Sequence, residues 1–190
     1  MLLEFERISL STELDKKIDT DLKDIIGVLK AYEDLFDINA NDIINKFYDM
    51  FIIDFLIGNN DRHNGNWGFL LDDKNKYSFS TIYDCGSCLN PLLDDEDIRK
   101  MDDTEIKNLA LNTYSVLKEN GKKIHYVSYI CESKNNEVTE ALKRVYSKIN
   151  IDIINEFIDN INAISDIRKG FYKKLIEIRY EILKKCYMNI

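Results

Sequence analysis

The feature that most constrains this chain is its shortage of turn-forming residues, with one proline and seven glycines among 190 residues. Few sharp reversals can be encoded by so few breakers, so a mostly helical chain is expected. Hydrophobic residues make up 45% of the sequence and charged residues 32%. That balance predicts a folded globule with a sizeable core, and the length favours a single domain over residues 1–190.

The overall charge argues against several functional classes. A formal net charge of −8 disfavours a nucleic-acid-binding surface, which needs clustered cations. Five lysines near the C-terminus are interpreted as a solvated helix face (Lys169, Lys173, Lys174, Lys184 and Lys185).

No apolar run reaches membrane-spanning length and no signal sequence opens the chain, so no membrane partner is expected. Four cysteines do not suggest a disulfide framework, and a reducing cytoplasm is expected. Richness in Ile, Asn, Lys and Asp suggests an AT-rich bacterial genome.

Hydrophobic spacing predicts a mainly α chain (α+β) with one small β-hairpin. A central helix begins near Asn39 or Asn41, is apolar on most sides and ends at Gly58. Alternation at 77–83 predicts a hairpin with 67–71. The remaining expected elements are a strand or extended entry at 2–10 and helices near 20–36, 103–119, 136–149, 151–163 and 167–188, with a stop at Gly121 and a short apolar run at 124–130.

A polar loop directly after the central helix carries the chemistry. Asp61 is followed five residues later by Asn66, and Asp84-Cys85-Gly86 lies just beyond the hairpin. Kinase-type scaffolds place an asparagine five residues after the catalytic aspartate and use a later Asp-x-Gly as a metal carboxylate. The hairpin is expected to bring the two segments together.

These residues fit phosphoryl transfer from ATP. Asp61 is predicted to accept the proton of the attacking hydroxyl, and Asn66 and Asp84 to bind Mg²⁺ and through it the cofactor ATP. His63 is a second catalytic candidate, which hydrogen-bonds or neutralises charge near the transferred phosphoryl group.

Three further residues are interpreted mainly as braces. Asn59 is a candidate cofactor contact, although both it and Arg62 are better placed to support the loop than to touch substrate. Asp54, inside the apolar helix, is expected to brace the loop as well. Lone His125 is interpreted as structural.

The loop resembles that of a known family. Gly58-Asn59-Asn60-Asp61-Arg62-His63-Asn64-Gly65-Asn66, with Leu56-Ile57 before it and Trp67-Gly68-Phe69 after it, is similar to the catalytic loop of HipA-like serine/threonine kinases. Tyr83-Asp84 resembles their metal-binding element, and Arg168, Phe171-Tyr172-Lys173 and Arg179-Tyr180 resemble their helical tail. The resemblance covers about residues 43–185. It implies a kinase C-lobe, Asp61 as base, Asn66 and Asp84 on Mg²⁺, and transfer to protein serine or threonine.

The resemblance also implies partners. Several HipA-like kinases are toxins controlled by a DNA-binding antitoxin, so an antitoxin partner is an expectation here. Members of the family carry an N-terminal ATP-gripping lobe, for which this sequence shows no glycine-rich phosphate loop. The chain is therefore expected to be a C-lobe fragment, a short homologue or half of a split kinase with an N-lobe partner chain, and to be poorly active alone.

Three alternatives stay open at this point. Asp-Arg-His-Asn-x-Asn also resembles the catalytic loop of phosphoinositide kinases, which would make the substrate a lipid. A degenerate lobe that only binds a partner is a second alternative. Cys85-Gly86-Ser87-Cys88 could be half of a zinc site or a redox pair, although Cys85 is better interpreted as a small packed hydrophobe.

Overall fold

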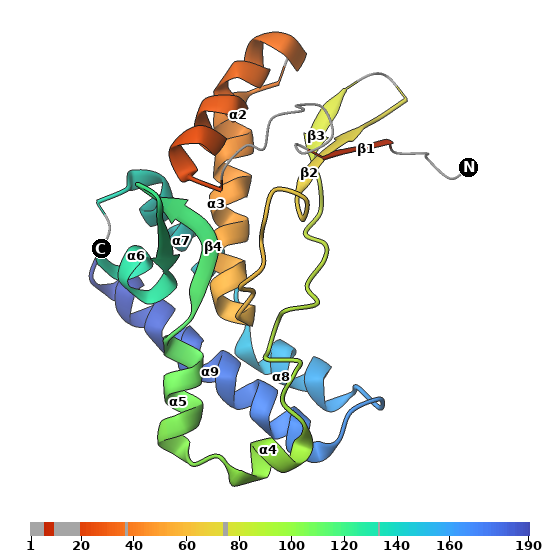
Figure 1. The fold of residues 1–190 in the computed structure, drawn as a ribbon, viewed down its shortest axis with the longest axis vertical. Coiled ribbons are helices and arrows are strands. Elements are labelled where there is room, and N and C mark those ends of the chain that lie inside the picture. Colours follow the sequence, from red (N-terminus) through yellow and green to blue (C-terminus); the bar gives the residue numbers. More distant parts are fainter. Residues whose placement is uncertain (1–5, 10–19, 37, 74–75, 133) are drawn as a thin grey trace.

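Helix α3 (Ala40–Ile57) is the central element of the structure (Figure 1). The Asn39 side chain caps it by accepting hydrogen bonds from the backbone N–H groups of Asn41 and Asp42, at 3.0 and 3.2 Å. Most of its side chains are buried, and the buried ones lie on all sides of the helix, as the sequence predicts for a helix in the middle of a fold. A central, rigid helix of this kind gives the loop that follows it a fixed starting point.

The computed structural model describes residues 6–9, 20–36, 38–73, 76–132 and 134–190. Along the chain the described elements are β1 (Glu6–Ser9), α2 (Leu22–Phe36), α3, β2 (Gly68–Leu71), β3 (Tyr77–Phe79), α4 (Asp95–Lys100), α5 (Asp103–Leu111), β4 (Tyr114–Glu119), β5 (Lys122–His125), α6 (Tyr126–Glu132), α7 (Asn136–Tyr146), α8 (Ile151–Asp159) and α9 (Asp166–Met188). The mainly helical prediction agrees with this order, and the rest of the expected entry strand at 2–10 lies outside the described residues.

The predicted hairpin is part of a three-stranded antiparallel sheet of order β1-β2-β3. Strand β2 pairs with β1 through Glu6 opposite Leu71, and with β3 through Phe69 opposite Phe79. Strand β3 ends at Phe79, so the predicted second arm at 77–83 is too long. The segment from Ser80 to Tyr83 is extended without being a strand and leads to Asp84.

One helix prediction is wrong in its second half. The expected helix at 103–119 ends at Leu111, and a second hairpin, β4–β5, follows. Asn120 and Gly121 connect its strands with φ of 52° and 76°, the left-handed pair that a tight two-residue hairpin turn requires. Gly121 is therefore a hairpin residue and does not stop a helix.

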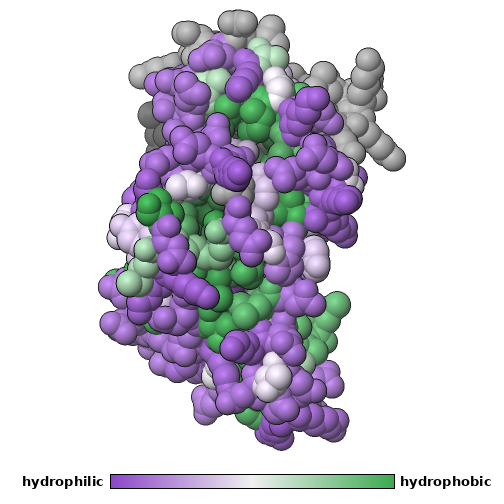
Figure 2. All heavy atoms as spheres, turned by 90° about the vertical axis from the view of Figure 1, so that its left-hand side faces the viewer, coloured by the Kyte–Doolittle hydropathy of each residue, from purple (hydrophilic) through white to green (hydrophobic). Residues whose placement is uncertain are grey.

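The helices pack around α3 in two groups. Helices α2, α7 and α9 contact α3 and enclose the main core, which includes Phe47, Phe51 and Phe55. A smaller core lies where α4 and α5 meet α9, around Ile98, Ile106 and Phe171. Figure 2 shows that one face is largely hydrophilic with a band of apolar residues through its middle. The predicted helices near 136–149 and 151–163 are present but end earlier, and the one predicted near 167–188 is present from Asp166 to Met188.

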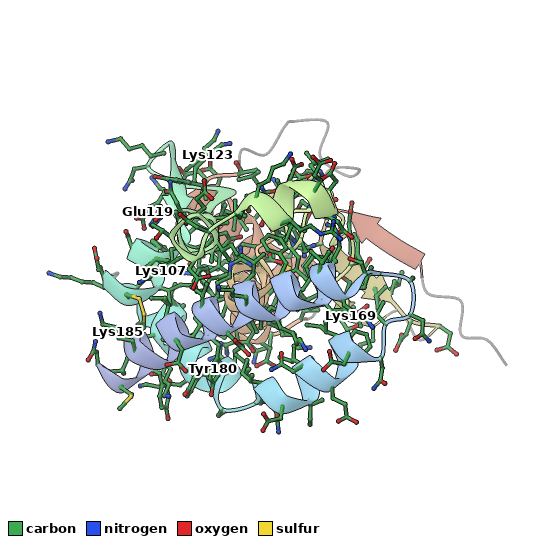
Figure 3. The ribbon with its side chains drawn as sticks, turned by 90° about the horizontal axis from the view of Figure 1, so that it is seen from below. Lys107, Glu119, Lys123, Lys169, Tyr180 and Lys185 are labelled. Atoms are coloured by element: carbon green, nitrogen blue, oxygen red, sulfur yellow. A yellow bond between two sulfur atoms is a disulfide. The ribbon has the colours of Figure 1, made fainter. Side chains whose placement is uncertain are left out.

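Helix α9 carries the five lysines noted in the sequence along its length. Figure 3 shows Lys169 near its start and Lys185 near its end. Ion pairs join four of these lysines to carboxylates: Lys169–Asp166, Lys173–Asp159, Lys174–Asp103 and Lys184–Glu181. These pairs support the interpretation of a solvated helix face. Within the described residues, no helix is long and apolar enough to cross a membrane.

Candidate active site

The candidate catalytic loop begins where α3 ends, at Gly58. The Gly58 N–H bonds the carbonyl of Phe55 at 3.1 Å and the Asn59 N–H bonds that of Asp54 at 2.8 Å. This paired closure, with Gly58 at φ 68°, is the usual glycine-dependent way to end a helix and turn the chain sharply. The turn sends residues 59–67 back across the end of α3 and fixes where the loop starts.

A buried ion pair holds the loop onto the helix. Arg62 donates from Nε to Asp54 Oδ2 at 2.9 Å and from Nη2 to Oδ1 at 2.8 Å. Their side chains are 0% and 1% exposed. Burial acts to lower the pKa of Arg62, but the hydrogen bonds and charge of Asp54 outweigh it and the pKa lies above its ordinary value. Burial raises the pKa of Asp54, against the bonds from Arg62 and Asn59. Two parallel hydrogen bonds therefore join Arg62 to Asp54 inside the protein.

Arg62 also binds the segment that precedes Asp84. Its Nη1 donates to the carbonyl of Asn66 at 2.6 Å and to the carbonyl of Tyr83 at 2.5 Å. One guanidinium therefore joins three segments: helix α3, the loop and the strand exit at Tyr83. The bracing that the sequence predicts for Arg62 and Asp54 is the arrangement that brings Asp61 and Asp84 to one place.

Asn59 is enclosed beneath the loop, with 0% of its surface exposed. Its amide nitrogen donates to Asp54 Oδ1 at 2.9 Å, and its Oδ1 accepts from the Asp61 N–H at 3.1 Å and from Ser87 Oγ at 2.6 Å. The Tyr126 hydroxyl donates to its carbonyl at 2.7 Å. Buried and bonded in this way, Asn59 supports the loop, which is the role that the sequence reasoning favoured for it over a cofactor contact.

Asp61 and Asp84 line one cavity of about 520 Å³. Both are exposed, and Asp84 has a left-handed backbone with φ 52°, uncommon for a residue other than glycine. The cavity wall also contains Asn60, Gly86, Ser87, Asn90, Pro91, Leu92, Leu93 and Leu109. The two carboxylates that the sequence singles out are therefore neighbours on one concave surface, with an apolar wall beside them.

Asn66 and His63 both lie close to Asp61. Asn66 is 5% exposed, and its amide nitrogen donates to the carbonyl of Asp61 at 2.8 Å. That bond leaves the Asn66 amide oxygen available as a hard ligand, although Asn66 does not line the cavity itself. His63 Nε2 lies 4.0 Å from Asp61 Oδ2, while Nδ1 accepts from the Gly65 N–H at 3.0 Å. The His63 ring is thus held close to the Asp61 carboxylate.

The donor set suits a hard divalent cation. Mg²⁺ prefers oxygen ligands, keeps several waters and is usually held by one or two carboxylates together with substrate phosphates. Asp84 offers an exposed carboxylate, and Asn66 offers an amide oxygen on the same short loop as Asp61. The residues present therefore fit the metal that phosphoryl transfer requires.

Two residues of the site were given no role in it by sequence reasoning, although Arg179 was named in the resemblance of the helical tail. Ser87 bonds Asn59 and lines the cavity, and its only sequence signal was its place between two cysteines. Arg179, on α9, lies against Gly58: a methyl group placed on Gly58 would lie 2.5 Å from Arg179 Nη1. No local pattern links these two positions, because only the packing of α9 brings them together.

Gly58→Ala tests the fit of the loop against Arg179. Left-handed backbone costs a residue with a Cβ about 1–2 kcal/mol, and here the new methyl also meets the guanidinium. Gly121→Ala is the matched control, since its φ is 76° but no atom lies within 4 Å of its added methyl. Urea unfolding should show a larger loss of the free energy of unfolding at Gly58 than at Gly121. Equal losses would mean that the Arg179 side chain moves away from the added methyl group without lowering the free energy of unfolding.

The cysteines differ from their sequence interpretation. Cys131 on α6 and Cys186 on α9 form a disulfide, which the sequence reasoning did not expect (Figure 3). Cys85 is exposed, which corrects its interpretation as a packed hydrophobe, and its sulfur lies 3.8 Å from Arg62 Nη2. Burial is the main cause that raises the pKa of Cys88 to about 12. Since Cys131 and Cys186 bind each other, they do not complete a zinc site with Cys85 and Cys88.

Comparison with known proteins finds similarity to a protein kinase. No protein-family model matches it. Over 174 residues it is 39% identical to the serine/threonine-protein kinase CtkA of Helicobacter pylori, an alignment covering 88% of this chain and 52% of CtkA. The chain thus spans about half the length of this curated relative. The crystal structure of a Helicobacter pylori proinflammatory kinase CtkA superposes with a TM-score of 0.89 and 33% identity, over 97% of this chain and 71% of that one. The chain therefore belongs to the family of the serine/threonine-protein kinase CtkA.

Proposed function

We propose that this chain carries the catalytic and metal-binding part of a HipA-like kinase that transfers a phosphoryl group from ATP to a serine or threonine of a protein. The observation that carries the proposal is the contact of Arg62 with Asp54, Asn66 and Tyr83, because it holds Asp61 and Asp84 on one cavity. The family relationship supports the same reaction class.

Each residue then has a defined task. Asp61 accepts a hydrogen bond from the substrate hydroxyl and takes its proton as that oxygen bonds to the γ-phosphorus of ATP and the bond from the γ-phosphorus to the ADP oxygen breaks, which releases ADP. Asp84 and Asn66 would hold Mg²⁺, which would neutralise charge on the ATP phosphates. His63, 4.0 Å from Asp61, adds a polar group beside the reacting oxygen. Asp54, Asn59 and Arg62 keep these groups in place and do not touch substrate.

The cavity wall gives a physical reason to expect low activity from residues 1–190 alone. In the described part of the chain, none of the residues that line the Asp61–Asp84 cavity is a lysine or arginine. Phosphoryl transfer depends on cations that position and neutralise the phosphates. We therefore propose that strong ATP binding needs a further ATP-gripping segment, in the same polypeptide or from a partner chain.

Asp84→Ala should weaken Mg²⁺-dependent nucleotide binding, because it removes the one carboxylate assigned to the metal. Titration calorimetry with MgATP, in an assembly that binds ATP, measures the effect, and about tenfold weaker binding is expected for the loss of a ligand worth roughly 1.4 kcal/mol. Asp73→Ala is the matched control, as it removes an exposed carboxylate in the β2–β3 turn, outside the cavity. Equal affinities for Asp84→Ala and the parent chain would place the metal elsewhere.

The substrate class is tested separately. The active assembly should label a protein substrate on serine or threonine and leave phosphoinositide vesicles unlabelled. Radiolabelled phosphate transfer to the two substrates, followed by phosphoamino-acid analysis, gives the answer. Lipid labelling alone would favour the phosphoinositide kinase alternative, and no labelling of either by an assembly that binds MgATP would favour a lobe that only binds a partner.

A further inference from the structure

A second cavity of about 450 Å³ adjoins the catalytic one. The two share Asn60, Asn90 and Leu109 in their walls, so they form neighbouring parts of one depression. The second cavity is further lined by Gly58, Asn112, Thr113, Tyr114, Lys123 and Arg179. A polypeptide with its hydroxyl at Asp61 would pass directly beside this space.

The charge of this second cavity is opposite to that of the protein. The whole chain has 34 acidic and 26 basic residues. Among the residues that the structure describes, however, the second cavity is lined by Lys123 and Arg179 and by no aspartate or glutamate. A carboxylate-free cavity with two cations is a preferred location for an anionic group in an otherwise acidic protein.

Arg179 is a buried cation without a counter-ion in the described structure. It is 1% exposed, its Nε donates to the carbonyl of Ala110 at 3.0 Å, and its Nη1 has no hydrogen-bond partner among the described residues. Burial lowers its pKa to about 10, so it stays protonated at neutral pH. Burying an unpaired charge is costly, and an anion bound nearby would offset that cost.

Lys123 provides the exposed cation of the same cavity. It lies on β5, forms no ion pair with any described residue, and stands on the hairpin away from Lys169 and Lys185 of α9 (Figure 3). Arg179 is enclosed behind Gly58 and acts mainly through its charge, while Lys123 is free to reach the ligand directly. Arg179 therefore contributes a buried positive charge behind the cavity, and Lys123 contributes an exposed side chain that can contact the ligand.

We propose that this cavity binds an acidic side chain of the protein substrate, close in sequence to the serine or threonine that is phosphorylated. The inference rests on the proposed function, since it places the acceptor hydroxyl at Asp61, and it adds a substrate preference to that function. A carboxylate or a phosphate on the substrate peptide would satisfy the same two cations.

Peptide binding in the absence of nucleotide and Mg²⁺ tests the proposal. Fluorescence anisotropy is measured for labelled serine peptides that carry a single glutamate at successive positions on either side of the serine, and for the same peptides with glutamine. A phosphoserine series separates phosphate from carboxylate recognition. At least one glutamate position should bind more tightly than its glutamine partner, and added salt should reduce the difference.

Lys123→Gln should reduce that glutamate preference by about fivefold, the size expected for one largely exposed charge contact. Lys122→Gln is the matched control, because Lys122 is an exposed lysine on the same strand that does not line the second cavity. Equal binding of glutamate and glutamine peptides, or equal losses in the two lysine variants, would overturn the proposal. Because the assay contains no nucleotide or metal, its failure is distinct from failure of the Asp84 experiment.

Discussion

Asp61→Asn should lower phosphoryl transfer by about 10²–10⁴-fold, the usual contribution of a positioned general base. The amide keeps the size of the side chain but cannot take the proton of the substrate hydroxyl. The measurement is the rate of radiolabelled phosphate transfer by an assembly that is active with the parent chain. This is the largest effect on activity that we expect from a single substitution.

The folded structure should be unaffected by this change. The Asp61 side chain is about half exposed, and the His63 ring lies 4.0 Å from its carboxylate. The thermal midpoint of unfolding should therefore match that of the parent chain. Asp73→Asn makes the same chemical change on an exposed carboxylate outside the cavity and should leave the rate unchanged. Normal turnover by correctly folded Asp61→Asn would show that another group is the base.

Arg62→Met should reduce the free energy of unfolding by about 3–5 kcal/mol, because it leaves the Asp54 carboxylate buried without its partner. The variant also loses the bonds from Arg62 to the carbonyls of Asn66 and Tyr83, so the loop and the Asp84 segment are no longer tied together. Urea unfolding measures the loss. It is the largest effect on stability that we expect, and activity should fall with it.

Two comparisons make this result specific. Arg144→Met removes a similar arginine, but its pair with Asp49 is partly exposed at 32% and 27%, so the expected loss is about 0–1 kcal/mol. Replacing both members of the buried pair, in Asp54→Leu with Arg62→Met, should recover part of the stability but not the activity. If Arg62→Met and Arg144→Met cost the same, the buried pair would not be the brace described above.

Much of the site could be predicted from sequence because its signals are local. The left-handed Gly58 ends α3, Asn39 caps it, and the step from Asp61 to Asn66 lies within one loop. Where a local signal was overlooked, the prediction failed. Asn120-Gly121 is a strong hairpin turn, and Ser115 and Leu117 are buried on alternate positions of β4, a strand pattern rather than a helical one.

The sequence by itself determined the central helix and the loop that follows it, and it gave Asp61 and Asp84 as candidate site residues, because glycine conformation, capping and residue spacing act over a few residues. Only the tertiary structure decided which distant groups meet. Arg62 reaches the carbonyl of Tyr83, Arg179 packs on Gly58, and Cys131 bonds Cys186. These contacts depend on how α3, α6 and α9 pack around one core, and burial then sets the strength of each charge interaction.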